Sequence, residues 1–328
     1  MVTEKQLGKS RLAKGMLLSI LAGVVVFVVL SLNLDIRQVG RALSEFKWGY
    51  VALILPLVAI NYLLRFCKWE YYLRRLNIRL ALRESAEIFL SGLSMSVTPG
   101  KLGEVFKSFL LQGLNGTPIS KSVPVVFAER VTDTLGLLIL ATVSISAIPD
   151  VNKILILIPA FILAAVIVLL RWKTACRRIL SFCGRLPVLG KISSQLQVSY
   201  EAAYTLLGAK SLIVGCALSV VSWGFECLAA YVVFLGLGMN AGFALSVFVV
   251  SFSLLLGAIS FIPGGLIVTE GSFAGLLIIA GFSKAIAGSA TVLTRMCTLW
   301  FAVLIGVFAL FVFKRRQSRK VVAIQPTS

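Results

Sequence analysis

Long apolar stretches separated by short basic segments dominate the hydropathy pattern of the chain. Seven of them are long enough, or nearly so, for a helix to cross a hydrocarbon core of about 30 Å. They cover residues 15–32, 48–64, 123–146, 153–170, 211–236, 243–262 and 288–313. Two further apolar segments, 85–112 and 264–283, are interrupted by proline, glycine and charged residues. The pattern predicts an all-α polytopic membrane protein of about seven or eight transmembrane helices, with one or two broken or re-entrant helices.

Lysine and arginine mark the segments that we expect on the cytoplasmic side of the membrane. These segments are 1–14, 65–83, 171–210 and 314–328. A cytoplasmic N-terminus agrees with both loops if 85–112 enters the membrane and returns on the same side. A cytoplasmic tail then requires 264–283 to cross fully, whereas a re-entrant 264–283 would place the tail outside. We expect a multi-pass protein of the cell (inner or cytoplasmic) membrane with a cytoplasmic N-terminus.

Two polar motifs inside the apolar region repeat the same order of residue types. Pro99-Gly100-Lys101-Leu102-Gly103-Glu104 is followed by Arg130, and Pro263-Gly264-Gly265-Leu266 leads to Glu270 and then to Arg295. Recurring broken segments with ionisable groups are how many transporters build a binding site at the bilayer midplane. The order predicts an internal repeat, 85–146 and 250–313. We expect it to lie in one integral domain, 1–328, whose helical bundle covers 15–313.

The first motif has the features of a phosphate site. Thr98 and Pro99 suit the cap and first turn of a helix, whose N-terminal N–H groups attract anions. Gly100 and Gly103 would let a lipid headgroup approach the backbone, and Lys101 and Lys107 would add positive charge. Glu104 has several possible roles: it could pair with Lys101, Lys107 or Arg130, contact a cationic headgroup moiety, or carry a proton.

A second group of charges, Glu129, Arg130 and Asp133, lies in the apolar stretch 123–146. A charge at the bilayer centre costs about 2.5–3.5 kcal/mol on insertion scales, so such a group is expected to face a cavity or a partner. Arginine suits bidentate contact with phosphate, and the two carboxylates could hold it when no lipid is bound. The alternative is an ion pair that only joins helices. Glu226 is a further intramembrane acid, without a partner nearby in the sequence.

Composition supports a membrane protein and argues against a soluble domain, a nucleic-acid-binding protein and a metal site. Hydrophobic residues make up 59% and charged residues 14% of the 328 positions, whereas soluble domains are about a quarter charged. The net charge of +19 does not indicate nucleic-acid binding, because the basic residues flank apolar stretches. Histidine is absent and the six cysteines show no CxxC spacing, so we expect no metal site and no cofactor. The basic and aromatic cluster 65–72 fits an interfacial anchor, with a gate or headgroup contact by Arg65 as the alternative.

The combined order of these residues resembles the transmembrane region of lysylphosphatidylglycerol synthases and related stand-alone flippase-like membrane proteins. The resemblance covers about 15–313, and it departs at Ile267, where the pattern has glycine. It implies movement of aminoacylated phospholipid between leaflets, while a separate cytosolic domain makes that lipid from aminoacyl-tRNA. Because the chain ends soon after its last apolar stretch, we expect it not to be a lysyltransferase itself.

Three hypotheses follow for function. The leading one is a lipid translocase in which Arg130 and Arg295 bind the phosphate of a phospholipid or a polyprenyl-phosphate-linked lipid, and Glu104 and Glu270 neutralise or recognise the rest. The second is a membrane enzyme of lipid or polyprenyl-linked sugar modification, with Glu104, Glu129 or Asp133 as a base or metal ligand. The third is an accessory subunit for a separate lipid-modifying enzyme or glycosyltransferase.

Overall fold

The computed structural model describes residues 40, 43–98, 104–147, 193–260, 262 and 265–324, together with scattered positions between 160 and 178. Every regular element within these residues is a helix, which confirms the predicted all-α class. The predicted first span, 15–32, and most of 153–170 lie outside the described residues.

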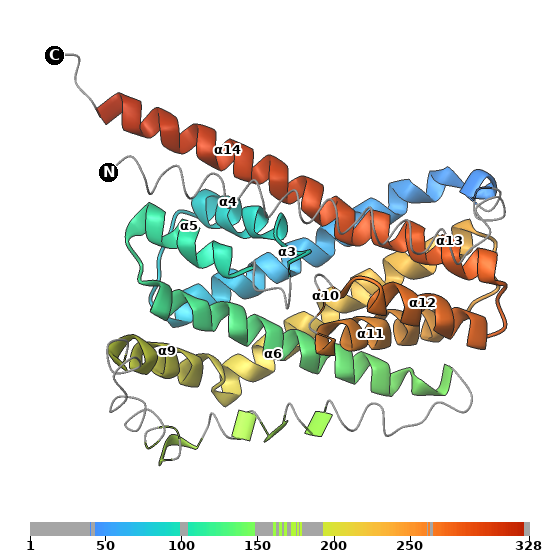
Figure 1. Ribbon diagram of the computed structural model, residues 1–328, viewed down its shortest axis with the longest axis horizontal. Helices are drawn as coiled ribbons and strands as arrows, with labels where there is room; N and C mark the ends of the chain where they lie inside the picture. Colours follow the sequence, from blue (N-terminus) through green and yellow to red (C-terminus); the bar gives the residue numbers. More distant parts are fainter. Residues whose placement is uncertain are drawn as a thin grey trace.

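Long helices form the body of the protein (Figure 1). They are α3 (Val51–Arg75), α6 (Ile119–Val143), α10 (Ala209–Gly236), and a continuous rod made of α13 (Lys284–Arg295), a π-helical turn (Met296–Trp300) and α14 (Phe301–Ile324). Among the described residues, three segments are long and apolar enough to cross a membrane: Trp48–Arg75, Ala209–Gly236 and Lys284–Gln317. The helix α6 is as long as α3 but carries the charged group predicted above, so its membrane-level charges need partners inside the protein.

Short helices form two hairpins between the long ones. The first hairpin consists of α4 (Leu82–Leu93) and α5 (Phe106–Asn115), and the second of α11 (Phe243–Ile259) and α12 (Val268–Ile279). At 1.5 Å per residue these helices are about 15 to 26 Å long, less than the thickness of a hydrocarbon core. In Figure 1 each hairpin occupies one half of the molecule, and the two tips approach each other near the middle from opposite ends.

The placement of the second hairpin bears on the choice between the two topologies of 264–283. Its helix α12 turns back beside α11 instead of continuing through the bundle, so the structure favours a segment that returns to the side it came from. The rod α13–α14 then runs to the end where α3 finishes and α4 begins (Figure 1). The segment 243–262, predicted as a full span, forms the other arm of this hairpin and does not cross either. The two segments therefore enter and leave on the same side, and the basic tail lies on the side of the other basic segments.

Most of the described basic side chains outside the interior lie at one end of the bundle. This basic end includes Arg74, Arg75, Arg79, Arg83, Lys210, Lys314, Arg315 and Arg316. At the opposite end the chain carries Lys47 and Lys284. The asymmetry is typical of a protein oriented by the positive-inside rule.

Close helix contacts fix the hairpins in the bundle. The helix α3 lies antiparallel to α10, with Asn61 Nδ2 donating to the Ser222 carbonyl at 2.7 Å. At the tip of the first hairpin, a Cβ added to Gly306 of α14 would lie 2.1 Å from the Ser94 backbone nitrogen. The rod and the first hairpin therefore touch backbone to backbone, which only glycine allows.

Candidate functional site

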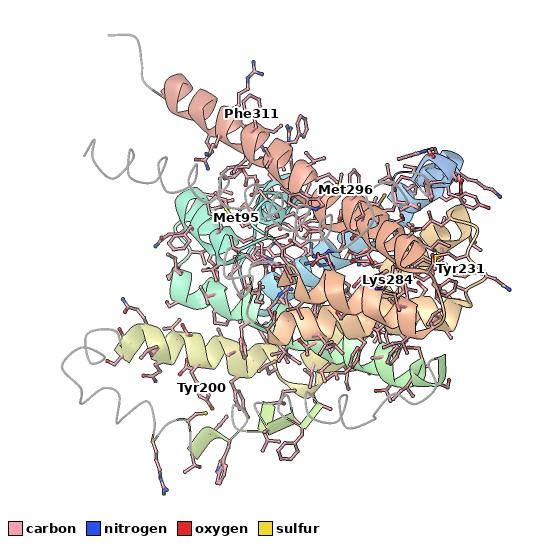
Figure 2. The ribbon with its side chains drawn as sticks, turned by 45° about the vertical axis from the view of Figure 1, so that its right-hand side comes forward. Met95, Tyr200, Tyr231, Lys284, Met296 and Phe311 are labelled. Carbon is pink, nitrogen blue, oxygen red and sulfur yellow. The ribbon has the colours of Figure 1, made fainter. Side chains whose placement is uncertain are left out.

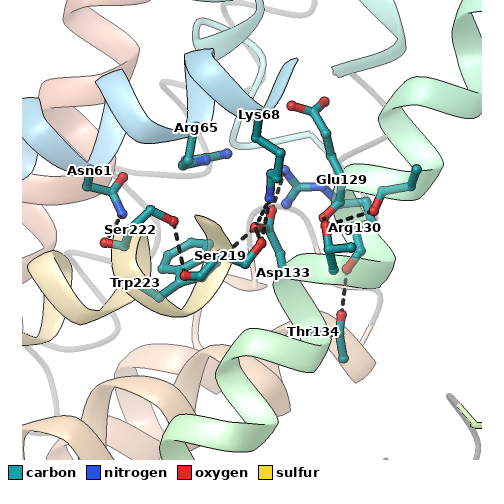
Figure 3. A network of polar contacts seen from close by, with 12 residues as sticks. Asn61, Arg65, Lys68, Glu129, Arg130, Asp133, Thr134, Ser219, Ser222 and Trp223 are labelled. Atoms are coloured by element: carbon teal, nitrogen blue, oxygen red, sulfur yellow. Dashed lines mark hydrogen bonds and ion pairs between the residues drawn. The ribbon is translucent and has the colours of Figure 1, made fainter. Parts of the chain in front are cut away.

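A buried network of ion pairs and hydrogen bonds joins α3, α6 and α10 (Figure 3). Lys68 of α3 is almost completely buried and forms an ion pair with Asp133 of α6. Its ammonium group also donates to Ser219 Oγ at 2.7 Å. Ser219 and the Trp223 indole, both on α10, each donate to Asp133 Oδ1 at 3.0 Å. Asp133 is therefore held by three helices at once, which offsets the cost of burying its charge.

Arg130 and Glu104 connect this network to the first hairpin. Arg130 Nη2 donates to Glu104 Oε2 at 2.9 Å and lies 3.2 Å from Asp133 Oδ2. Glu104 also lies 3.9 Å from a guanidinium nitrogen of Arg65 and 3.9 Å from the Lys107 ammonium. Two of the partners considered for Glu104 in the sequence, Lys107 and Arg130, are thus both present.

Lys107 enters the protein from α5 across the first hairpin. Its ammonium donates to Glu129 Oε2 at 2.6 Å and lies 4.5 Å from the centroid of the Trp69 ring. A Cβ on Gly92 of α4 would lie 2.5 Å from the Lys107 side chain. The lysine stem therefore passes over a glycine, and the buried acid and the aromatic ring together stabilise its charge.

The second hairpin carries a simpler arrangement. Arg295, at the end of α13, donates from Nε to Glu270 Oε1 at 2.6 Å, and both side chains are buried. Glu270 lies in the first turn of α12, and Glu104 lies just before α5. Each acid is thus near the start of the returning helix of its hairpin, and each pairs with an arginine on the long helix that follows. The internal repeat itself stays a prediction, and this geometry agrees with it.

A small cavity of about 50 Å³ lies between the two hairpin tips. Its described lining includes Arg65, Glu104, Glu226 and Arg295, together with Tyr62, Ser96, Trp223, Leu254, Thr298, Leu299 and Ala302. This volume holds a few water molecules and no lipid headgroup. In this conformation Glu104 and Glu270 form ion pairs with Arg130 and Arg295.

The π-helical turn Met296–Trp300 shapes one wall of this cavity. The Tyr62 hydroxyl donates to the Thr298 carbonyl in this turn at 2.6 Å. Wider π turns occur mostly at functional positions of helices. Here the turn directly follows Arg295, so it separates the arginine from the regular helix α14.

Sequence reasoning missed several members of the site. The cluster 65–72 was interpreted as an interfacial anchor, and this is wrong for Lys68, Trp69 and Tyr72, which are buried in the bundle. The alternative role of Arg65 remains open, since it lines the cavity. A helical stripe was the available signal, because polar residues at 61, 65, 68 and 72 fall on one face of a helix.

The described residues bring together most of the predicted charges, namely Glu104, Lys107, Glu129, Arg130, Asp133, Glu270 and Arg295. The predicted residues Pro99, Gly100, Lys101, Gly103, Pro263 and Gly264 lie outside the described residues, and so does the predicted helix start after Thr98. Thr98 itself donates its hydroxyl to the Met95 carbonyl at 2.7 Å, and α5 begins at Phe106.

The tip of the second hairpin is tightly packed and strained. Gly265 has φ of 66°, and a Cβ there would lie 3.0 Å from the Gly257 Cα. Ile267 has φ of 71°, an unusual conformation for a β-branched residue. This is the residue that stands where the sequence pattern has glycine, and its positive φ is a conformation that glycine adopts without strain.

Comparison with known proteins places the chain in a family. Residues 16–306 match the family described as the lysylphosphatidylglycerol synthase TM region. The chain belongs to this family. The suspected resemblance is therefore confirmed, and the protein is an integral membrane protein with multiple apolar helices.

Relatives of the lysylphosphatidylglycerol synthase TM family extend across nearly the whole chain. A UPF0104 membrane protein of Methanothermobacter thermautotrophicus is 25% identical over 304 residues, covering 86% of this chain and 89% of the relative. UPF0104 membrane protein PH1989 of Pyrococcus horikoshii is 24% identical over 327 residues, covering 92% of this chain and 97% of the relative. The family match shows the family, and these relatives support the membrane class.

Proposed function

We propose that the protein is a lipid translocase that binds the phosphate of a phospholipid or lipid-linked glycan carrier at Arg130 and Arg295 and moves it between leaflets. The observation that carries this proposal is the central cavity. It lies where two hairpins from opposite ends meet, and its lining includes Arg295 together with Glu104, the acid that pairs with Arg130. Intramembrane charges of this kind usually mark a substrate path.

Around the first hairpin the network can exchange partners without leaving a charge unpaired. The described charged side chains in or beside it are basic at Arg65, Lys68, Lys107, Arg130 and Arg295, and acidic in equal number at Glu104, Glu129, Asp133, Glu226 and Glu270. When a phosphate takes Arg130, Glu104 retains Arg65 and Lys107 within reach. Arg130 Nε, which finds no hydrogen bond among the described residues, offers a further donor to the phosphate.

The two hairpins supply alternate routes to this position. The first hairpin opens toward the basic end, which we place in the cytoplasm by the positive-inside rule, and the second opens toward the other side. Movement of one tip while the other stays packed would expose the arginines to one leaflet at a time. At the tips, Gly306 of α14 packs against the first hairpin, and Gly257 packs against Gly265 inside the second hairpin.

Mass spectrometry of co-purified lipids tests binding, and a reconstituted assay tests movement. Wild-type protein in mild detergent should enrich one phosphate-bearing lipid class, and Arg130→Gln and Arg295→Gln should each remove that enrichment. The same variants should slow the transfer of a fluorescent analogue of that lipid across liposomes by at least about tenfold, which corresponds to 1.4 kcal/mol. Arg74→Gln is the matched control, because Arg74 is exposed and pairs with Glu70 on the surface of the same bundle.

Other outcomes separate the remaining hypotheses. An unselective lipid profile that neither substitution changes would sink the translocase and leave structural ion pairs. Selective binding that both substitutions abolish, with no transfer in liposomes, would favour the accessory subunit of a lipid-modifying enzyme or glycosyltransferase. Chemical change of the bound lipid by the purified protein would favour the enzyme.

A further inference from the structure

A second surface combines apolar and basic side chains away from the central cavity. A groove of about 410 Å³ lies at the basic end between α4 and α14. Its described lining is Arg83 from α4, with Phe308, Phe311, Val312, Arg315 and Arg316 from α14. These residues are either basic or apolar, so the groove differs from the central cavity, where acids and bases alternate.

The lining of α14 follows one helical face. Positions 308, 311, 312 and 315 are spaced by three and four residues, so they lie along a single stripe. Phe308 and Phe311 are 69% and 62% exposed, and both lie within the membrane-crossing segment Lys284–Gln317. Figure 2 shows Phe311 on the part of α14 that extends past the packed helices. We therefore expect lipid hydrocarbon around these rings.

The polar end of the stripe carries an excess of positive charge. Glu87 of α4, beside the groove, lies 3.1 Å from Arg83 Nε and 3.1 Å from Arg316 Nη1. One carboxylate thus contacts two guanidinium groups, and Arg315 adds a third on the same groove. An anionic group entering the groove would meet a net positive site that already links α4 to α14.

We propose that this groove binds an anionic phospholipid of the leaflet at the basic end, separately from the transported lipid. The phosphate would lie among Arg83, Arg315 and Arg316, and the acyl chains would follow Phe308 and Phe311 toward the bilayer centre. From Phe308 to Arg315 the helix rises about 10 Å, so the rings reach acyl-chain depth when the arginines are at the phosphate. Basic pockets between membrane helices recognise lipid headgroups in this way.

The position of the groove implies that a bound lipid would affect the first hairpin. Arg83 lies at the start of the first hairpin, while Arg315 and Arg316 lie on the rod that packs against its tip. A lipid that bridges them would hold the first hairpin against α14. Anionic lipid would therefore stabilise the closed first hairpin, which a zwitterionic lipid would do less.

The test compares thermal unfolding of the full-length protein in detergent with phosphatidylglycerol, phosphatidylcholine or soluble glycerol phosphate. Phosphatidylglycerol should raise the melting temperature of the wild type by several degrees more than phosphatidylcholine, and glycerol phosphate should have no effect. The double variant Arg315→Gln/Arg316→Gln should lose the difference between the two lipids. Arg74→Gln, an exposed arginine at the same end, should keep it. A double variant that retains the full difference would overturn the proposal.

A second measurement locates the lipid and separates this site from the central one. Phosphatidylglycerol with a photoactivatable acyl chain should label the peptide that contains 308–316, and labelling confined to other helices would contradict the assignment. Arg295→Gln should retain this labelling, because the central cavity and the groove share no described lining residue. Loss of transport with intact labelling in Arg295→Gln would support a groove site that is separate from the central one.

Discussion

Both hairpins bring charged residues into the interior of the bundle, but the two sets of charges are paired differently. The first hairpin presents Glu104 and Lys107 to a network that also includes Arg65, Lys68 and Arg130. The second hairpin consists of apolar helices, and its described ion pair joins Glu270 to Arg295 alone. The first half of the site is therefore redundant, because Glu104 and Asp133 each have more than one cationic partner, whereas the described ion-pair partner of Glu270 is Arg295.

This difference indicates which half can move at lower cost. In the first hairpin a carboxylate can leave one cation and keep another within 3.9 Å. In the second, separation of the pair leaves a buried carboxylate uncompensated, which costs about 3–5 kcal/mol in proteins. We therefore expect ligand exchange to begin at the first hairpin, at the basic end of the bundle.

The largest effect should come from breaking the single pair of the second hairpin. Arg295→Gln leaves Glu270 buried without its ion-pair partner, and we expect a loss of about 3–5 kcal/mol in unfolding free energy. Reversible unfolding in detergent measures it. The double variant Arg295→Gln/Glu270→Gln should recover most of the loss, because no lone charge remains. If the double variant is as unstable as the single one, the pair is not the cause.

A packing change at the first hairpin should have the next largest effect. Gly306→Ala places a Cβ against the α4 backbone, which cannot move away as a flexible side chain can. Overpacking of this kind costs about 1–3 kcal/mol. Gly224→Ala is the matched control within a helix, since a Cβ there meets nothing within 4 Å. Equal melting temperatures for the two variants would show that the rod and the first hairpin are not in close contact.

The redundancy of the first half predicts a smaller cost for Arg130→Gln than for Arg295→Gln. Glu104 keeps Arg65 and Lys107 nearby, and Asp133 keeps Lys68, so we expect a loss of about 1–2 kcal/mol, in the range of a hydrogen bond to a charged group. Lipid binding should nevertheless be lost to the same extent in both variants. A stability loss as large as that of Arg295→Gln would remove the distinction between the hairpins.

The smallest effect, of opposite sign, should come from the strained tip of the second hairpin. Ile267→Gly removes the side chain from a residue with φ of 71°, and relief of strain of about 1–3 kcal/mol is partly offset by the greater entropy of glycine in the unfolded chain. We expect a gain of about 1 kcal/mol, measured by thermal unfolding. Ile279→Gly, at an exposed position within α12, is the control and should lose stability.

Hydrophobic periodicity and composition alone determined the class of this protein. Apolar stretches of about 20 residues have no stable alternative to helices in a membrane, because every backbone hydrogen bond must be made internally. For the same reason, intramembrane charges such as Arg130 and Asp133 could be recognised as members of a site. Their spacing of three residues also predicted their contact, since such residues are neighbours on a helix.

Only the tertiary structure decided which distant charges meet. Lys68 and Asp133 are far apart in the sequence, and no local rule links them. The sequence pattern around Lys68 therefore looks the same whether the lysine lies at the membrane interface or is buried against an acid. The path of α11 and α12 was also undecided, because an apolar helix of either topology has the same composition. In the structure, close packing of glycines against backbone at the hairpin tips fixes that path. Local patterns set which residues must be buried, whereas long-range packing sets the partner against which each of them is buried.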